Sequence, residues 1–280
     1  MEITKGIKVF ITGAASGIGR STAIAIAGLG GRLFLTDRNA PGLEETAELA
    51  RKAGGEVCKL KVMDVSDYEA VKSFADEIHD SFGPLDILMN IAGIALFALP
   101  EDMTPAHWKK VIDVNLFGPI HAIQCFLPEM IRAKEGHVVN VASLAGLIGL
   151  PWHGAYSASK AGLVRLSEVL RVDLKQHHIG ITVVCPGAVE TPLKQTVEIL
   201  GVDMTRPDFQ EVKNRFSQHA VSPEKVADQI LRAIRKNKFL VITSLDVRFF
   251  YYCKHHHPLI YHYVLNYISN LMNSGRYPKP

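Results

Sequence analysis

The sequence predicts an α/β fold whose core is a doubly wound parallel sheet of about seven strands, flanked by helices and followed by a C-terminal helical extension. Three observations support this fold. Short apolar strands alternate with helical patterns along most of the chain, as they do in parallel sheets. A glycine-rich loop joins the first strand to the first helix. The chain has 280 residues, 48% of them hydrophobic, so it can bury a sizeable core.

The predicted elements follow one another in a regular order. Strand-like apolar runs lie at residues 7–12, 31–37, 57–62, 85–90, 136–142, 179–185 and 239–243. Helical patterns lie at residues 20–29, 42–53, 67–82, 104–133, 156–176 and 223–236. We therefore expect one catalytic domain over residues 1–244 and a separate extension over residues 245–280. Residues 193–221 are less regular.

The loop after the first strand has the composition of a phosphate-binding turn. Its sequence is Gly13-Ala-Ala-Ser16-Gly17-Ile18-Gly19, and an Ala- and Ile-rich helix follows. Glycines let backbone amides approach a pyrophosphate, and the helix N-terminus adds partial positive charge. A plain tight turn is the alternative. The strand–loop–helix context favours a dinucleotide site.

Polar residues end the next strands of the predicted sheet. Asp37 can accept hydrogen bonds from ribose hydroxyls and would repel a 2′-phosphate, which favours NAD over NADP. Arg38 could instead bind that phosphate. Asp64 is placed either to meet an adenine edge or to cap the following helix. Asn90 could link neighbouring strand ends, and Gly93 would let the cofactor come close.

Pro119 lies inside the predicted helix over residues 104–133. Because proline has no amide hydrogen, the carbonyl of Asn115 loses its helical partner. The freed carbonyl could hold a proton-relay water, or the irregularity could be a kink with no function.

A hydroxyl, a phenol and an ammonium lie within one short segment, at Ser143, Tyr156 and Lys160. Ser143 follows a strand, so it faces the crevice where open α/β sheets bind ligands. Tyr156 and Lys160 share a helix face, one turn apart. A nearby ammonium favours the phenolate, which predicts a lowered pKa for Tyr156 and proton exchange near neutral pH. Taken alone, the Tyr-x-x-x-Lys pattern also fits two surface residues.

Together these motifs resemble the short-chain dehydrogenase/reductase family, in the branch with a single Rossmann domain. The resemblance covers roughly residues 5–243 and implies a variable substrate lid over about residues 193–221. It rests on Thr12-Gly13-x-x-x-Gly17-x-Gly19, Asn90-x-Ala92-Gly93, Asn115, Ser143, Tyr156-x-x-x-Lys160 and Pro186-Gly187.

The resemblance implies residue roles. Tyr156 would be the general acid/base, Lys160 would lower its pKa and bind the nicotinamide ribose, Ser143 would position the substrate oxygen, and Asn115 would hold the relay water. The implied cofactor-binding residues are Gly13, Ser16, Gly17, Ile18, Gly19, Asp37, Arg38, Asp64, Val65, Asn90, Ala92, Gly93, Tyr156, Lys160, Pro186, Gly187, Val189 and Thr191. A homodimer or homotetramer would form where the long helices around Asn115 and Tyr156 pair across subunits.

Apolar residues beside these motifs predict a hydrophobic substrate. The expected pocket residues are Ile94, Ser143, Leu144, Leu150, Trp152 and Tyr156, with Leu96, Phe97 and Leu147 on the same apolar wall. Leu193, Leu200, Met204 and Phe209 are expected to cover them. Ordinary loop packing is the alternative. The leading function is hydride transfer between NAD(H) and a secondary alcohol or ketone of steroid, retinoid or lipid type. The alternatives are an NADPH-dependent 3-oxoacyl-[acyl-carrier-protein] reductase and a non-catalytic cofactor sensor or scaffold.

The extension is rich in tyrosine and basic residues. Ile260, Tyr263, Val264, Tyr267, Ile268 and Leu271 fall at helical spacing and predict a single apolar stripe. This stripe could lie on a membrane surface, cover the pocket, or pack on a partner subunit. Adjacent histidines at 255–257 do not share a helical face, so we expect no metal site there.

Composition excludes several classes. A net charge of +3 is too small to argue for nucleic acid. Four scattered cysteines indicate a reducing compartment. We see no signal peptide and no run of apolar residues long enough to span a bilayer. These features predict a cytoplasmic protein, with peripheral membrane contact through the extension as an open possibility.

Overall fold

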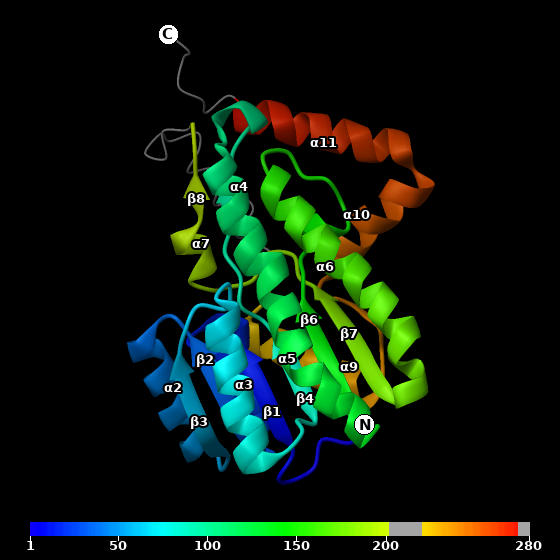
Figure 1. The fold of residues 1–280 in the computed structure, drawn as a ribbon. Helices are drawn as coiled ribbons and strands as arrows, with labels where there is room; N and C mark the ends of the chain where they lie inside the picture. Colours follow the sequence, from blue (N-terminus) through cyan, green and yellow to red (C-terminus); the bar gives the residue numbers. More distant parts are fainter. Residues whose placement is uncertain (202–219, 274–280) are drawn as a thin grey trace.

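The computed structural model describes residues 1–201 and 220–273. Within them a seven-stranded parallel sheet has the order β3-β2-β1-β4-β6-β7-β9 (Figure 1). Its strands are β1 (Lys8–Thr12), β2 (Arg32–Asp37), β3 (Glu56–Val62), β4 (Ile87–Asn90), β6 (Gly136–Val141), β7 (Ile179–Cys185) and β9 (Leu240–Ile242). The predicted doubly wound sheet is confirmed, and the strand ends differ from the predicted ones by two residues at most.

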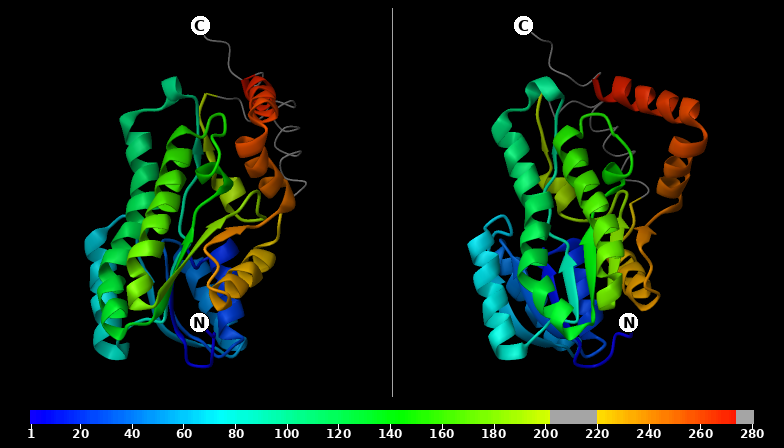
Figure 2. Two further views of the ribbon diagram at one scale, coloured as in Figure 1. Left: turned by 90° about the vertical axis from the view of Figure 1, so that its right-hand side faces the viewer. Right: turned by 45° about the vertical axis from the view of Figure 1, so that its right-hand side comes forward.

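Two helical layers cover the sheet, because successive strand residues point to opposite faces. Val9 and Ile11 share a core with α1 (Gly17–Ala27), α2 (Ala40–Lys52) and α9 (Pro223–Arg235). Phe10, between them in the sequence, packs in the other core with α3 (Tyr68–Phe82), α5 (Gly118–Ala133) and α6 (Gly154–Asp173). Figure 2 shows the sheet between these layers.

The helical run from Pro105 to Ala133 is interrupted where Pro119 predicted an irregularity. It consists of α4 (Pro105–Ile112), a π-helical turn η2 (Asp113–Phe117) and α5. In η2 the Gly118 amide donates to the Asp113 carbonyl, one residue further back than in an α-helix. By length and composition the 29-residue run could cross a bilayer. However, Phe126 and Met130 are fully buried against the sheet, so it serves as a core helix of the domain.

A small second sheet stands beside the main one. Residues Leu96–Phe97 form β5 and residues Glu198–Ile199 form β8, and the two strands pair in parallel. Between β7 and β8 lies the one-turn helix α7 (Leu193–Thr196). The first part of the predicted substrate cover therefore lies against residues that follow β4. Met204 and Phe209, also predicted to cover the pocket, lie outside the described residues.

The extension forms two helices, α10 (Leu245–His256) and α11 (Pro258–Asn273). Val247 and Cys253 of α10 and Tyr261 of α11 are buried in a core that includes Leu163 of α6. Figure 1 shows α11 across the end of the molecule that carries β8. The six residues of the predicted apolar stripe all lie on α11 but differ in burial: Val264, Ile268 and Leu271 are half-buried, whereas Ile260, Tyr263 and Tyr267 are exposed.

Candidate active site

The three polar residues of the Ser143–Lys160 segment meet at the carboxyl edge of the sheet. Ser143 follows β6 and caps a 3-10 turn, with its hydroxyl accepting from Ala145 N at 3.2 Å. Tyr156 and Lys160 lie on the first turns of α6 and are both buried. The phenol of Tyr156 hydrogen bonds with the Ser143 side chain. One substrate oxygen could therefore contact both hydroxyls.

The ionisation of Tyr156 differs from the prediction. Burial raises the pKa of the Tyr156 phenol, and the hydrogen bond with Ser143 opposes this effect by a smaller amount. Lys160 Nζ donates to the Val141 carbonyl at 2.9 Å rather than to the phenol. The expectation that Lys160 lowers this pKa is therefore wrong for the chain by itself. Burial instead lowers the pKa of Lys160 itself, to about 8.

Asn115 lies in the π-turn η2 and is fully buried. Its Oδ1 accepts from Ile94 N at 2.9 Å, and its Nδ2 donates to Ile94 O at 2.9 Å and to Ser159 Oγ at 3.2 Å. A Cβ on Gly93 would stand 3.1 Å from Asn115 Oδ1 and 3.3 Å from Lys160 Nζ. The absence of a side chain at Gly93 thus lets both Asn115 and Lys160 lie close to its backbone. The relay water remains a prediction.

The glycine loop forms a close-packed cradle. Gly13 and Gly17 have φ angles of +70° and +52°, which side-chain-bearing residues rarely adopt. A Cβ on Gly13 would come within 2.8 Å of the Ala92 backbone, and one on Gly17 within 2.7 Å of the Thr191 side chain. Thr12 Oγ1 accepts from Ala92 N at 3.1 Å. Three segments that lie far apart in the sequence therefore pack closely around this strand–loop–helix junction, the kind of junction that binds the pyrophosphate of a dinucleotide.

The acid at the end of β2 faces this cradle. Asp37 Oδ2 accepts from Ala15 N at 3.1 Å, and Oδ1 accepts from Asn39 N at 2.9 Å. Arg38 pairs with Asp64 across 3.4 Å. Asp64 also accepts from Ser66 N at 2.9 Å, but the cap of α3 is Asp67. The alternative in which Asp64 caps this helix is therefore wrong.

The remaining predicted cofactor residues lie along the same edge. Asn90 Nδ2 donates to Asn140 Oδ1 at 2.9 Å, which confirms the predicted link between neighbouring strand ends, β4 and β6. The Pro186 carbonyl accepts from Leu144 N at 2.8 Å and so joins the Pro-Gly turn to the Ser143 turn. The other predicted cofactor residues follow strand ends or begin α1 at this edge. They are Ser16, Ile18, Gly19, Val65, Gly187 and Val189.

The sequence profile of the family described as short chain dehydrogenase matches residues 8–199, well over half of the chain. The chain belongs to the short-chain dehydrogenase family. Like other members named for this activity, it is a dehydrogenase/reductase.

Relatives and solved structures agree with this assignment. The bovine (Bos taurus) dehydrogenase/reductase SDR family member 7B is 37% identical over 242 residues, which are 84% of this chain and 73% of the relative. A short-chain dehydrogenase/reductase from Burkholderia phymatum in complex with NAD is 28% identical, with a TM-score of 0.78 over 100% of this chain and 99% of that one. A metagenomic short-chain oxidoreductase in complex with NADP is 30% identical, with a TM-score of 0.70 over 87% and 100% of the two chains.

The surroundings of Tyr156 in this short-chain dehydrogenase are apolar. Tyr156 packs in one cluster with Ala95, Ala145, Phe97, Leu150, Leu193 and Val197. Two residues predicted for the pocket, Leu150 and Tyr156, are therefore in contact with the start of the predicted cover. Ile94 instead packs beneath β5 with Val111, and Leu144 packs towards α10.

Phe97 was expected in the apolar wall beside Tyr156, whereas its neighbour His153 was missed by sequence reasoning. The ring of Phe97 meets Tyr156 edge-on at 5.7 Å between centroids, and the His153 ring lies 3.8 Å from Phe97. His153 Nδ1 is 2.6 Å from the Pro151 carbonyl, which can only accept, so Nδ1 carries the proton. Burial lowers the pKa of His153 to about 4, so the ring is neutral at pH 7. Its position three residues before Tyr156 was the available signal.

The extension is tied to the segment between Ser143 and Tyr156 at three points. Lys254 Nζ donates to the Leu147 carbonyl at 2.6 Å, the Gly149 backbone hydrogen bonds to the Tyr261 hydroxyl, and Trp152 Nε1 donates to Asn273 Oδ1 at 3.1 Å. Trp152 was predicted to line the pocket, and it packs with both Phe97 and Met272 of α11. The extension therefore holds the segment that was predicted to form one wall of the pocket.

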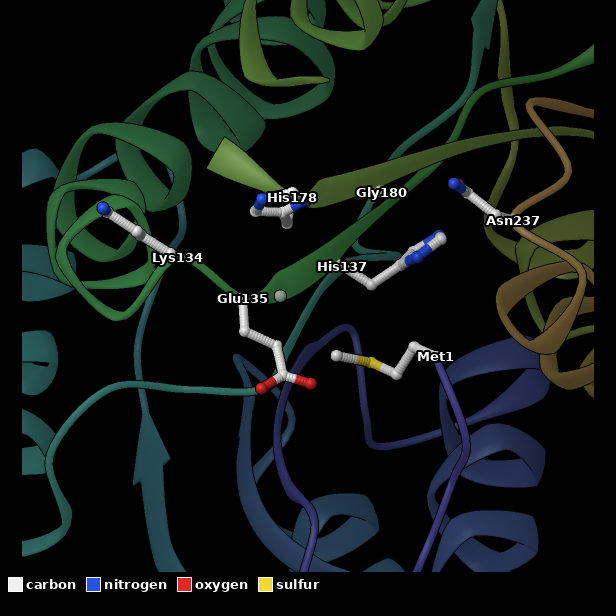
Figure 3. A pocket seen from close by; sticks show the side chains of 8 residues that line it. Met1, Lys134, Glu135, His137, His178, Gly180 and Asn237 are labelled. Atoms are coloured by element: carbon white, nitrogen blue, oxygen red, sulfur yellow. The ribbon is translucent and has the colours of Figure 1, made fainter. Parts of the chain in front are cut away.

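A separate cavity of about 230 Å³ lies away from these residues (Figure 3). His137, Gly180 and Asn237 line it together with Met1 and Glu135. Gly136 and Ile179 begin β6 and β7, so this cavity lies at the amino edge of the sheet, opposite Tyr156. We therefore do not assign the substrate to it.

Proposed function

We propose that this chain transfers a hydride between NAD(H) and a hydrophobic secondary alcohol or its ketone, of steroid, retinoid or lipid type. The observation that carries the proposal is the apolar cluster around Tyr156, formed by Phe97, Leu150, Leu193 and Val197. Pockets of this composition bind apolar ligands and use a few polar groups to orient them. Here the polar groups are Ser143 and Tyr156.

Each residue has a distinct part in this proposal. The nicotinamide ring, when bound, supplies or accepts the hydride. Ser143 donates a hydrogen bond to the substrate oxygen and orients it against Tyr156. The Tyr156 hydroxyl gives a proton to that oxygen in reduction and takes it in oxidation. Lys160, with its lowered pKa of about 8, can pass a proton onwards, and Asn115 would hold the water that receives it.

Asp37 supports NAD as the preferred cofactor. Its carboxylate lies beside the glycine loop, where a 2′-phosphate would meet like charge. Arg38 is the residue that could favour NADP, but its guanidinium is paired with Asp64. Titration with NADH and NADPH, followed by cofactor fluorescence, tests this choice. Tighter binding of NADPH would overturn the role given to Asp37 and would favour the 3-oxoacyl reductase alternative.

Tyr156→Phe tests the chemistry, because it removes the hydroxyl and keeps the ring. We expect turnover of a steroid or long-chain alcohol panel to fall by roughly 10²–10⁴-fold while NADH binding persists. Tyr68→Phe, on the surface of α3, is the matched control. Undiminished turnover in Tyr156→Phe would contradict the mechanism. No cofactor-dependent turnover in the unmodified protein on any alcohol or ketone would favour the sensor or scaffold alternative.

We also propose a homodimer or homotetramer through the outer faces of α4, η2 and α6. Trp108, Phe117, Val169 and Val172 are exposed there, which a monomer would leave in water. Val172→Glu should lower the mass measured by light scattering in solution. An unmodified chain that is already monomeric would refute this arrangement. The four free cysteines fit a reducing, cytoplasmic location.

A further inference from the structure

The outer faces of α10 and α11 carry an unusual share of exposed apolar surface. In the described residues fourteen large hydrophobic side chains are exposed, and half of them lie on these two helices. They are Leu245, Phe249 and Tyr252 on α10 and Leu259, Ile260, Tyr263 and Tyr267 on α11. We call this set the outer apolar face. Figures 1 and 2 show α11 at the edge of the molecule, with no other described element on its outer side.

The residues of the outer apolar face follow helical spacing. On α10 they recur at intervals of four and three, and on α11 Ile260, Tyr263 and Tyr267 continue at three and four. Tyr263 is 75% exposed and Leu259 is 85% exposed, so the face is not covered by the domain. A water-facing helix surface would ordinarily carry charge. In contrast, the 16 residues of α11 include no Asp, Glu, Lys or Arg.

Charge around this face has one dominant sign. Between residues 245 and 273 the only acid is Asp246, whereas Arg248 and Lys254 are basic and four further residues are histidines. Arg248 and His255–257 are exposed. Two copies that met through this face would bring like charges together. An anionic lipid surface would attract these basic side chains, and interfacial tyrosines also favour such surfaces.

The length of α11 determines how it could lie on lipid. Sixteen residues make a helix of about 24 Å, which is shorter than the roughly 30 Å hydrocarbon core of a bilayer. Its inner side is also held to the domain, by Tyr261 and by the Asn273–Trp152 hydrogen bond. The helix can therefore rest in the interface, parallel to the surface, but cannot cross it.

We propose that α10 and α11 dock this dehydrogenase on an anionic lipid surface through the outer apolar face. The same helices form the outer wall of the pocket: Met272 packs on Trp152, Trp152 packs on Phe97, and Phe97 meets Tyr156. The docked side is therefore the pocket side. If the proposed function holds, an apolar substrate dissolved in the lipid would reach the protein next to Trp152 and Phe97, on the side from which it approaches Tyr156.

Vesicle flotation of the full-length protein, without cofactor or substrate, tests the docking. We expect co-flotation with phosphatidylcholine vesicles that contain phosphatidylglycerol, and less with phosphatidylcholine alone or at high salt. The double variant Phe249→Ser/Tyr263→Ser should partition roughly tenfold less, because it removes two large apolar groups from the interface. Leu29→Ser/Val62→Ser removes two exposed apolar side chains near the other edge of the sheet and is the matched control.

Several outcomes would overturn the proposal. The first is that the unmodified protein stays with the unbound fraction on anionic vesicles. The second is that the outer-face variant floats as well as the unmodified protein, or that the control loses as much binding. The third is a lower mass of the outer-face variant in solution with no change in flotation, which would make this face a contact between copies. Tyr156→Phe should float normally, so failure of the catalytic proposal is distinguishable.

Discussion

Lys160→Met should stabilise the protein at neutral pH while it abolishes turnover. Lys160 is 3% exposed, and burial lowers its pKa from 10.5 to about 8. Below both values the ammonium is present in the folded and unfolded chains alike, and the folded chain holds it at a cost. By linkage this cost is about 3 kcal/mol near pH 7. The buried ammonium is therefore expected to lower the stability of the folded chain at a position proposed to take part in proton transfer.

The sign of the effect follows from the direction of the shift. Because the folded-state pKa lies below the unfolded one, the unfolded chain binds more protons between about pH 8 and 10.5, and stability is lost as pH falls through that window. Methionine removes this dependence. It also leaves the Val141 carbonyl without the Lys160 donor, which costs about 1 kcal/mol. The net gain is about 2 kcal/mol near pH 7 and disappears near pH 10.

Urea denaturation followed by circular dichroism near pH 7 and near pH 10 measures this difference. Lys160→Met is compared with the unmodified chain at each pH, both without added cofactor. The contributions of other titrating groups to the free energy of unfolding are then common to both proteins and cancel in the difference. Lys225→Met, at an exposed position on α9, should change stability little at either pH. If Lys160→Met destabilises the protein equally at both pH values, the buried ammonium carries no cost to stability.

Three further predictions concern the packing around the site and the acid stability of the fold. Gly93→Ala should lower turnover about tenfold or more, since its Cβ would press on Asn115, whereas Gly149→Ala, with open space around it, should not. Asn273→Ala should raise KM more than it lowers kcat, because the Trp152 wall touches the pocket and not the reacting atoms. Burial lowers the pKa of His137 to about 3, so stability should fall from about pH 6.5 downwards, by about 2 kcal/mol at pH 5, and His137→Gln should reduce this loss in urea unfolding.

Each of these three has a contrary result. Equal losses of turnover in Gly93→Ala and Gly149→Ala would show that the close approach of Asn115 to Gly93 is not the cause of the loss. A fall in kcat alone for Asn273→Ala would show that the contact between α11 and Trp152 affects the chemical step and not substrate binding. An acid response in His137→Gln as steep as in the unmodified chain would assign the loss to other groups, of which His153 is one.

Most of the sheet and the position of the site could be predicted because both depend on local signals. Apolar runs of five to seven residues became β1, β2, β3 and β7 nearly as expected. Residues that end parallel strands meet at one edge by geometry alone, which brought Asp37, Asn90 and Ser143 together. Tyr156 and Lys160 were placed by the helical repeat. Pro119 marked the irregular turn, although its π-helical form was not predicted.

The ionisation states could not be predicted, because they depend on burial by distant segments. A lysine near a tyrosine lowers the phenol pKa only if the two interact without other partners. Here Lys160 is held by the Val141 carbonyl, and Tyr156 is covered by Leu193 and Val197 from beyond β7. Burial then raises the pKa of the phenol and lowers that of the ammonium. Neither contact follows from the spacing of the two residues.

The split of the predicted stripe on α11 has a physical reason. Helical periodicity shows which residues share a face, but not where a neighbour contacts that face. Tyr261, Leu265 and Met272 are turned towards the domain by the Gly149 and Trp152 contacts, so the contact line lies to one side of the apolar stripe. One flank of the stripe is thereby buried, and Ile260, Tyr263 and Tyr267 are left in water. The contacts of α11 with Gly149 and Trp152 therefore also determine which residues form the outer apolar face. A substitution that breaks these contacts should change the exposure of that face as well.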